Sequence, residues 1–87
     1  MIKFEIEKML EMGILREDPF REKIKNWDWG QYRGRQVLIK GCSSVPIPTW
    51  AYLIVAAHLS QVADEVLYGE EKGYTLIFKH GAQPAKV

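Results

Sequence analysis

The sequence has little of several features on which common protein classes depend. Its single cysteine, Cys42, cannot form an internal disulfide, whereas small secreted domains usually need several. Residues 1–7 alternate charged and bulky side chains and lack the apolar segment of a secretory leader. The longest apolar run, residues 50–57, is far shorter than the ~20 residues of a membrane span. These absences predict a cytoplasmic protein with no membrane partner.

An excess of one charge is also missing. The chain carries 12 basic and 11 acidic residues, which gives a net charge of +1. Domains that bind nucleic acid through its phosphates usually show a basic excess or a basic stripe. The nearest feature is Arg33 and Arg35 followed by Lys40, which is short and diluted by neutral residues. This balance argues against a nucleic-acid partner.

Metal ligands and nucleophile–base pairs are equally few. A structural zinc ion needs four ligands and an iron–sulfur cluster four thiolates, but the chain offers only Cys42, His58 and His80. The sharpest enzymatic hypothesis is a pair of Cys42 and His58. However, His58 lies about nine residues into a predicted helix, ~13 Å along the axis from the loop that carries Cys42. We therefore expect no metal, no cofactor and no catalytic residue, and a protein that is not an enzyme.

What the sequence does have is apolar material. Hydrophobic residues make up 47% of the chain and aromatic residues 11%, which favours a packed core over disorder. A chain of 87 residues forms one domain, and at this size a domain buries only roughly 60–65% of its unfolded surface. We predict a single α/β domain over residues 1–80, followed by a flexible tail over residues 81–87.

The N-terminal segment admits two structures. Residues 5–12 match a short helix, with Ile6, Met9 and Leu10 on one face and Gly13 after its end. The alternation of Ile2, Phe4 and Ile6 also fits an edge strand. We predict the helix and keep the strand as the alternative.

The next helix has clear local signals. Asp18 is a typical N-cap residue, Pro19 suits the first helical position, and the helix should end near residue 28. The apolar stripe of this helix consists of Phe20, Ile24 and Trp27.

The remaining elements predict an α/β fold. They follow in the order strand, loop, helix, strand, turn and strand: residues 37–40, 41–48, 48–61, 65–68, 69–73 and 74–78. The predicted fold is a small three-stranded mixed sheet with a right-handed β-α-β crossover and a final hairpin, with two N-terminal helices packed against the sheet. The helix over residues 48–61 is apolar nearly all round, so it needs cover on more than one side. We expect the sheet to cover one side and either the two N-terminal helices or a second subunit to cover another, and we predict a homodimer.

The loop after the first of these strands is the predicted ligand site. In open α/β sheets ligands bind at the carboxyl ends of the strands, and a thiol near a helix N-terminus can have a lowered pKa. Hydroxyls and loop amides there could also bind an oxyanion. The candidate ligand-binding residues are Gly41, Cys42, Ser43, Ser44 and Thr49. The alternative is that Cys42 is a small buried core residue and the serines satisfy the loop backbone.

Aromatic residues suggest a second kind of site. The segment of residues 26–32 is unusually aromatic for a loop, and exposed aromatic side chains are typical interaction hot spots. The candidate interaction residues are Trp29, Tyr32 and Trp50. The competing interpretation is that the aromatic side chains of residues 26–32 complete a helix stripe and close the core over the sheet.

Four segments of the chain carry a family resemblance. They are Leu-Arg-Glu at 15–17, Phe-Arg-Glu at 20–22, Asp-Trp-Gly-Gln-Tyr at 28–32 and Val-Pro-Ile-Pro-Thr-Trp-Ala-Tyr at 45–52. Together they resemble the bacterial family called domain of unknown function 2480, over about residues 4–69 of this chain. The last segment is the most specific of the four.

The resemblance carries its own expectations. Members of that family carry the strand–loop–helix pattern twice, whereas this chain has it once, so a homodimer could supply the missing half. The family has no established activity, but its genes are often described near those of the Suf iron–sulfur assembly system. The resemblance therefore implies a non-catalytic interaction or accessory module, with iron–sulfur assembly proteins as partners. The alternative is small-molecule or oxyanion binding, or sulfur handling, at Cys42.

Overall fold

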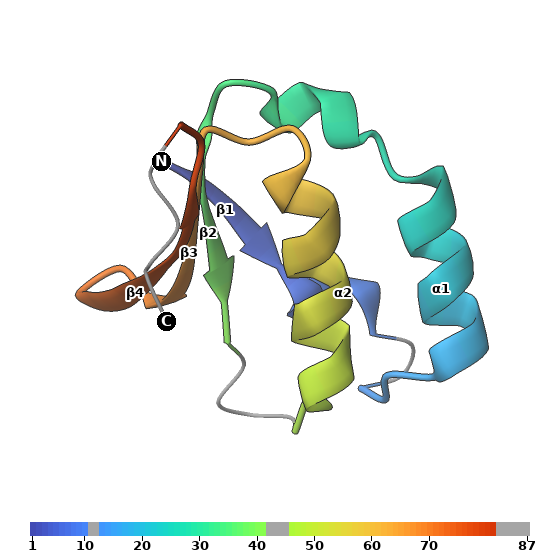
Figure 1. Ribbon diagram of the computed structural model, residues 1–87. Helices are drawn as coiled ribbons and strands as arrows, with labels where there is room; N and C mark the ends of the chain where they lie inside the picture. The colour runs from blue at the N-terminus through green and yellow to red at the C-terminus, as the bar shows by residue number, and fades with distance from the viewer. Residues whose placement is uncertain (11–12, 42–45, 82–87) are drawn as a thin grey trace, which may run out of the picture.

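The computed structural model describes residues 1–10, 13–41 and 46–81 (Figure 1). Its elements are the strands β1 (Ile2–Glu5), β2 (Gln36–Lys40), β3 (Glu65–Glu70) and β4 (Gly73–Lys79), the helices α1 (Glu17–Asn26) and α2 (Thr49–Ser60), and the single 3₁₀ turns η1 (Ile6–Met9) and η2 (Trp29–Tyr32). The strands lie in the order β1-β2-β3-β4. Strands β1, β2 and β3 are parallel, and β4 is antiparallel to β3.

The predicted three-stranded sheet is wrong, because the sheet has a fourth strand at the N-terminus. Strand β1 pairs with β2 in the register Ile2↔Val37 to Glu5↔Lys40. This pairing places Phe4 on the inner face of the sheet, where its side chain is buried. Only the turn η1 remains of the helix predicted over residues 5–12, whose last two positions lie outside the described residues.

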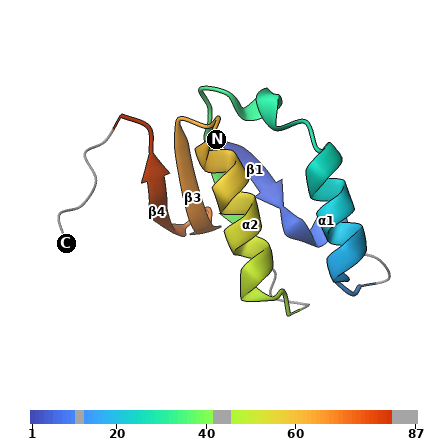
Figure 2. The same cartoon turned by 45° about the vertical axis from the view of Figure 1, so that its right-hand side comes forward.

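Both helices lie on one face of the sheet (Figures 1 and 2). The connections β1-α1-β2 and β2-α2-β3 each join neighbouring parallel strands and advance in the same direction across the sheet. When two β-α-β crossovers have the same handedness and move across the sheet in the same direction, their helices lie on the same face of the sheet. The described residues therefore form two layers, and none of their helices covers the other face of the sheet.

Helix α2 runs from Thr49 to Ser60, within one residue of its predicted ends. Its apolar stripe Ala51, Val55 and Leu59 packs on the inner face of the sheet. These three side chains are fully buried. They join a single core whose other buried members include Phe4, Ile6, Phe20, Ile24, Tyr32, Val37, Ile39 and Val66. No helix in the described part of the chain has the length and apolarity that crossing a bilayer requires.

Helix α1 begins at Glu17, so the prediction that Asp18 is its N-cap is wrong. The N-cap is Arg16, which makes no side-chain capping bond. Its carbonyl oxygen accepts the first helical hydrogen bond, from the amide of Phe20 at 3.0 Å. Pro19 is tolerated as the third residue because the amides of the first turn have no helical acceptor in any case. The helix ends at Asn26, and Trp27 already has an extended backbone.

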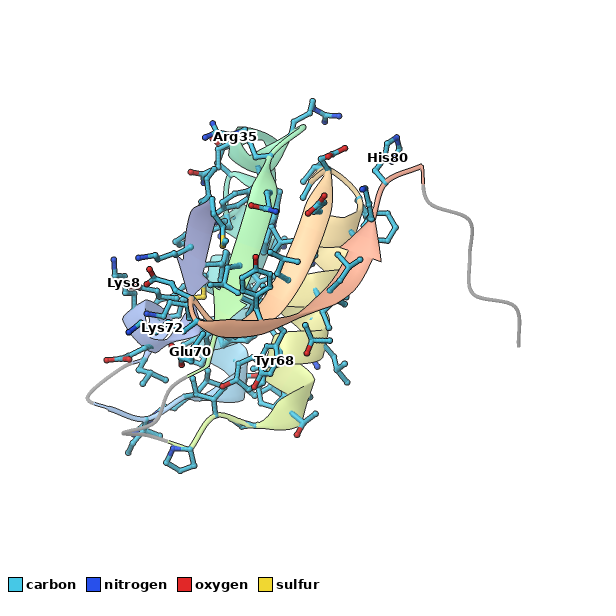
Figure 3. All side chains as sticks on the ribbon, turned by 90° about the vertical axis from the view of Figure 1, so that its left-hand side faces the viewer. Lys8, Arg35, Tyr68, Glu70, Lys72 and His80 are labelled. Atoms are coloured by element: carbon cyan, nitrogen blue, oxygen red, sulfur yellow. The ribbon has the colours of Figure 1, made fainter. Side chains whose placement is uncertain are left out.

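The β3–β4 hairpin bends over the face of the sheet that has no helix. Gly69, with φ of 135°, lies at this bend, and Glu71 at the hairpin tip reaches Lys3 on β1, with 2.7 Å between Oε1 and Nζ. Figure 3, which views this side, shows β4 crossing in front of the sheet near Glu70 and Lys72. On this face Leu38 and Leu67 are 0% and 2% exposed. The curled hairpin therefore gives this face a small buried patch of its own.

Candidate functional site

The predicted ligand loop is described only at its two ends. Gly41 follows β2 and is partly buried, and Thr49 is the exposed first residue of α2. Cys42, Ser43 and Ser44 lie outside the described residues, so ligand or sulfur chemistry there stays a prediction. At Gly41 a Cβ atom would lie 3.6 Å from the Tyr68 hydroxyl and 3.8 Å from the Tyr52 hydroxyl. Two tyrosine hydroxyls therefore lie near Gly41, where this loop begins.

A polar hollow lies beside Gly41, at the carboxyl ends of β1 and β2. It has a volume of about 340 Å³ and is lined by Glu5, Glu7, Lys8, Lys40, Gly41 and Glu70. Three carboxylates face two ammonium groups across it. The surplus of negative charge disfavours an anion, because each carboxylate repels it. Oxyanion binding at the predicted loop stays a prediction, because most of that loop lies outside the described residues.

Ion pairs around the polar hollow hold the hairpin tip against the rest of the sheet. The Lys40 ammonium lies 3.9 Å from Glu70 and 3.8 Å from Glu71, and Lys3 pairs with Glu71 from the next strand. The hydrogen bond from Lys3 holds the pKa of the Glu71 carboxyl below its ordinary value, and the same contact raises the pKa of Lys3. Likewise, Lys8 lowers the pKa of Glu5. We call the contacts among Lys3, Lys40, Glu70 and Glu71 the hairpin latch.

A larger, apolar groove lies on the helix side of the sheet, between α2 and the outer strands. It has a volume of about 520 Å³ and is lined by Ile39, Ile47, Thr49, Tyr52, Leu53, Ala56, Tyr68 and Ile77. The rings of Tyr52 and Tyr68 meet edge to face, with 5.1 Å between their centroids. Leu53 is 65% exposed and Ile77 about half exposed, so the groove presents apolar carbon to its surroundings.

Strand β4 extends this apolar region to the other face of the sheet. The side chains of Tyr74 and Leu76 are about half exposed. Tyr74 pairs with Gly69 and Leu76 pairs with Leu67, so the side chains of Tyr74 and Leu76 lie on the face of the sheet without helices. We define the apolar edge as the five exposed apolar side chains around β4: Leu53, Tyr68, Tyr74, Leu76 and Ile77. Exposed apolar side chains gathered in one place are typical of interaction surfaces.

The apolar edge was not predicted from the sequence. Its members come from α2, β3 and β4 and are separated by up to 24 positions (Leu53 to Ile77). One signal was available in the sequence. An edge strand with one face in water usually alternates apolar and polar side chains, whereas residues 74–78 carry apolar side chains on both faces.

The predicted aromatic interaction residues lie around the core. Tyr32 is buried, and its hydroxyl oxygen accepts a hydrogen bond of 2.9 Å from Trp27 Nε1. The ring of Trp29 is stacked between Phe4 and His58, at centroid distances of 5.6 and 4.7 Å. These contacts give both side chains a packing role, and a role in binding a partner stays a prediction for them.

Trp50, at the start of α2, contacts α1. Its ring meets Phe20 edge to face at 5.7 Å, and the guanidinium of Arg21 lies 5.9 Å from the ring centroid. The contact with Phe20 joins the two helices, and Trp50 remains partly exposed. A role for Trp50 in binding a partner likewise stays a prediction.

Histidine and carboxylate side chains do not gather into a metal site in the described ranges, where no group of three His, Cys, Asp or Glu side chains could hold a metal ion. The ring of His58 stacks on Trp29, and His80 follows β4, where its amide donates a 2.7 Å hydrogen bond to the carbonyl of Asp64. The described residues thus offer a charged hollow and an apolar edge, and the apolar edge is the larger uncovered feature.

Comparison with known proteins gives one result. The model of a family described as "Protein of unknown function (DUF2480)" matches residues 1–82, nearly the whole chain. No curated protein matches the sequence, and no solved structure matches it. The resemblance seen in the four sequence segments is thereby confirmed, and the chain belongs to the DUF2480 family of proteins of unknown function.

Proposed function

We propose that this domain is a non-catalytic interaction module that forms a homodimer through the apolar edge. The observation that carries the proposal is the gathering of five exposed apolar side chains from α2, β3 and β4 at one side of the molecule. Large apolar side chains exposed together cost free energy in water, and burying each one fully is worth about 1.5–3 kcal/mol. A partner surface of the same kind would recover part of that free energy from both sides.

A second copy suits this edge better than a charged partner. Leu53, Tyr68 and Ile77 present carbon at the groove, and the charged hairpin latch lies away from them, towards β1. A two-fold axis brings identical patches together, so an apolar patch meets an apolar patch. Because the side chains are exposed only in part, we expect reversible association in the micromolar range rather than an obligate dimer.

Sedimentation equilibrium between about 5 µM and about 500 µM tests the proposal, because this range brackets the affinity expected of such surfaces. The unaltered chain should approach twice the monomer mass as its concentration rises. Leu53→Glu should remain monomeric, because it would place a carboxylate in the interface. Ile14→Glu is the matched control: Ile14 is also an apolar residue, 54% exposed, but it lies before α1.

Two outcomes would contradict the proposal. A monomer mass for the unaltered chain over the whole range would refute the homodimer. A dimer that survives Leu53→Glu but dissociates in Ile14→Glu would place the interface elsewhere. Circular dichroism of both variants shows that a loss of mass does not come from unfolding.

The proposal also includes an accessory role with iron–sulfur assembly proteins as partners. It is supported by the family resemblance and requires a thiol that partners can reach at Cys42. Iodoacetamide labelling of the folded protein across pH tests that requirement, since the thiolate is the reactive form. Labelling of Cys42 only after denaturation would exclude sulfur handling by this residue.

A further inference from the structure

We propose that β4 pairs antiparallel with β4 of a second copy, so that two four-stranded sheets become one sheet of eight strands. This inference rests on the proposed homodimer and names its geometry. Strand β4 differs from β1, the strand at the opposite edge of the sheet, in its backbone pairing and in its sequence.

The outer side of β4 is an open hydrogen-bonding edge. Strand β4 is last in the strand order, and within residues 1–10, 13–41 and 46–81 no strand pairs with its outer side. Its seven residues, Gly73–Lys79, span roughly 23 Å at ~3.3 Å per residue. Unpaired backbone N–H and C=O groups along such an edge are a ready template for another strand.

The register shows which peptide groups point outward. Glu70 pairs with Gly73 across a two-residue turn, and hydrogen-bonded and non-hydrogen-bonded pairs alternate along an antiparallel ladder. By this alternation the pairs Gly69↔Tyr74 and Leu67↔Leu76 are the non-hydrogen-bonded ones. The peptide groups of Tyr74 and Leu76 therefore point away from β3.

A bond at the far end of the hairpin agrees with this alternation. The amide of His80 donates to the carbonyl of Asp64 at 2.7 Å, as expected where Glu65↔Lys79 is a non-hydrogen-bonded pair. The irregularity in register beside Val66 and Leu67 adds one residue to β4 between these two ends. Both ends of the ladder thus agree on which β3–β4 pairs are hydrogen-bonded.

The two edges of the sheet differ in their protection against pairing. Natural edge strands are short, carry charges or prolines, or are covered. Strand β1 has four residues, and its Lys3 and Glu5 each take part in an ion pair. Strand β4 has seven residues, and from Gly73 to Phe78 it contains no charge and no proline. The irregularity in register and Lys79 lie beyond Leu76, so the first half of β4, from Gly73 to Leu76, is the less protected of the two edges.

A second β4 also fits in charge. In an antiparallel pair of two β4 strands centred on Leu76, the uncharged stretches Gly73–Phe78 of the two copies lie side by side, so no like charges face each other along them. The apolar Tyr74 and Leu76 lie within this stretch. A continuous sheet would also bring the apolar edges of the two copies together.

Amide hydrogen exchange followed by NMR tests this geometry on the unaltered chain. The exchange rates of the Tyr74 and Leu76 amides should fall at least roughly tenfold when the protein concentration rises from the monomer range into the dimer range. The amide of Thr75 points towards β3 by the same alternation and serves as the internal control. Its protection should change much less with concentration.

The variant Leu76→Pro tests the same geometry by mass. Proline removes the outward N–H group, and it is tolerated on edge strands where that group is free of ladder bonds. The variant should be folded and monomeric. Leu76→Val keeps the peptide group and an apolar β-branched side chain, so it should still dimerise.

The outcomes separate this inference from the homodimer itself. If the unaltered chain forms dimers while the Tyr74 and Leu76 amides exchange at a concentration-independent rate, the strand pairing is refuted and the homodimer stands. Dimerisation of Leu76→Pro at unchanged affinity would refute the pairing in the same way. A chain that stays monomeric overturns both. If Leu76→Pro fails to fold, the exchange measurement on the unaltered chain decides.

Discussion

Substituting alanine for Gly69 should strongly destabilise the β3–β4 hairpin. At Gly69 the backbone has φ of 135°, a region that side-chain-bearing residues rarely adopt. A Cβ atom there would lie 2.5 Å from the carbonyl oxygen of Gly73 and 3.0 Å from Cα of Tyr74. The partner strand therefore cannot stay in place beside a methyl group.

Two costs add in the variant. Holding a non-glycine residue in such a backbone region costs about 1–3 kcal/mol. Relieving the contact with Gly73 requires a shift of the backbone on the opposite strand, which loosens the hairpin. Together we expect a loss of roughly 2–4 kcal/mol. A domain of 87 residues has a free energy of unfolding of about 4–13 kcal/mol, at ~0.05–0.15 kcal/mol per residue, so the loss is a large fraction of the total.

Urea unfolding followed by tryptophan fluorescence measures the effect, and two other glycines supply controls. Gly34 has φ of 71°, but a Cβ atom there would have no neighbour within 4 Å, so Gly34→Ala isolates the backbone cost of about 1–2 kcal/mol. Gly73 has neither a positive φ nor a neighbour within 4 Å, and Gly73→Ala should stay within ~0.5 kcal/mol of the unaltered chain. A Gly69→Ala variant no less stable than Gly73→Ala would refute the close approach.

Two further predictions concern side-chain contacts. Because Lys3 lowers the pKa of Glu71, the hairpin latch should be intact above the ordinary carboxyl pKa and be lost as pH falls through the lowered one. In Lys3→Met, an NMR titration should show the pKa of Glu71 return towards its ordinary value, and an unchanged titration would contradict the latch. Tyr32→Phe removes the acceptor of the Trp27 indole N–H and should cost about 1 kcal/mol in urea unfolding, with a loss above ~3 kcal/mol contradicting the assignment. The cost is modest because Trp27 is partly exposed, and its indole can turn to water.

Local signals predicted several elements well. Helix α2 lies within one residue of its predicted ends, because two prolines before it and a continuous run of helix-compatible apolar residues define it locally. The parallel pairing of β2 with β3 and the β3–β4 hairpin were also predicted and are confirmed. Each depends on neighbouring segments of the chain, where strand patterns, turn residues and connection lengths limit the alternatives.

The N-terminal strand shows where local signals compete. Residues 2–6 alternate with period two and residues 6–10 repeat with helical spacing, so the two patterns overlap at Ile6. The open edge of β2 decided between them: pairing with β2 satisfies the backbone of β1 and buries Phe4. The partner of β1 lies about 35 positions away, as in Ile2↔Val37, and no short window of sequence contains it.

By itself the sequence determined the α/β class, the family, the position of α2 and the final hairpin, because composition, motifs and short-range periodicity carry that information. The tertiary structure alone decided the fourth strand, the bend of the hairpin at Gly69 and the apolar edge. Each of these depends on backbones or side chains brought together from distant positions, and the burial of a side chain depends on what packs over it. Whether Leu53, Leu76 and Ile77 lie in a core or on a surface could therefore be seen only once α2, β3 and β4 were placed together.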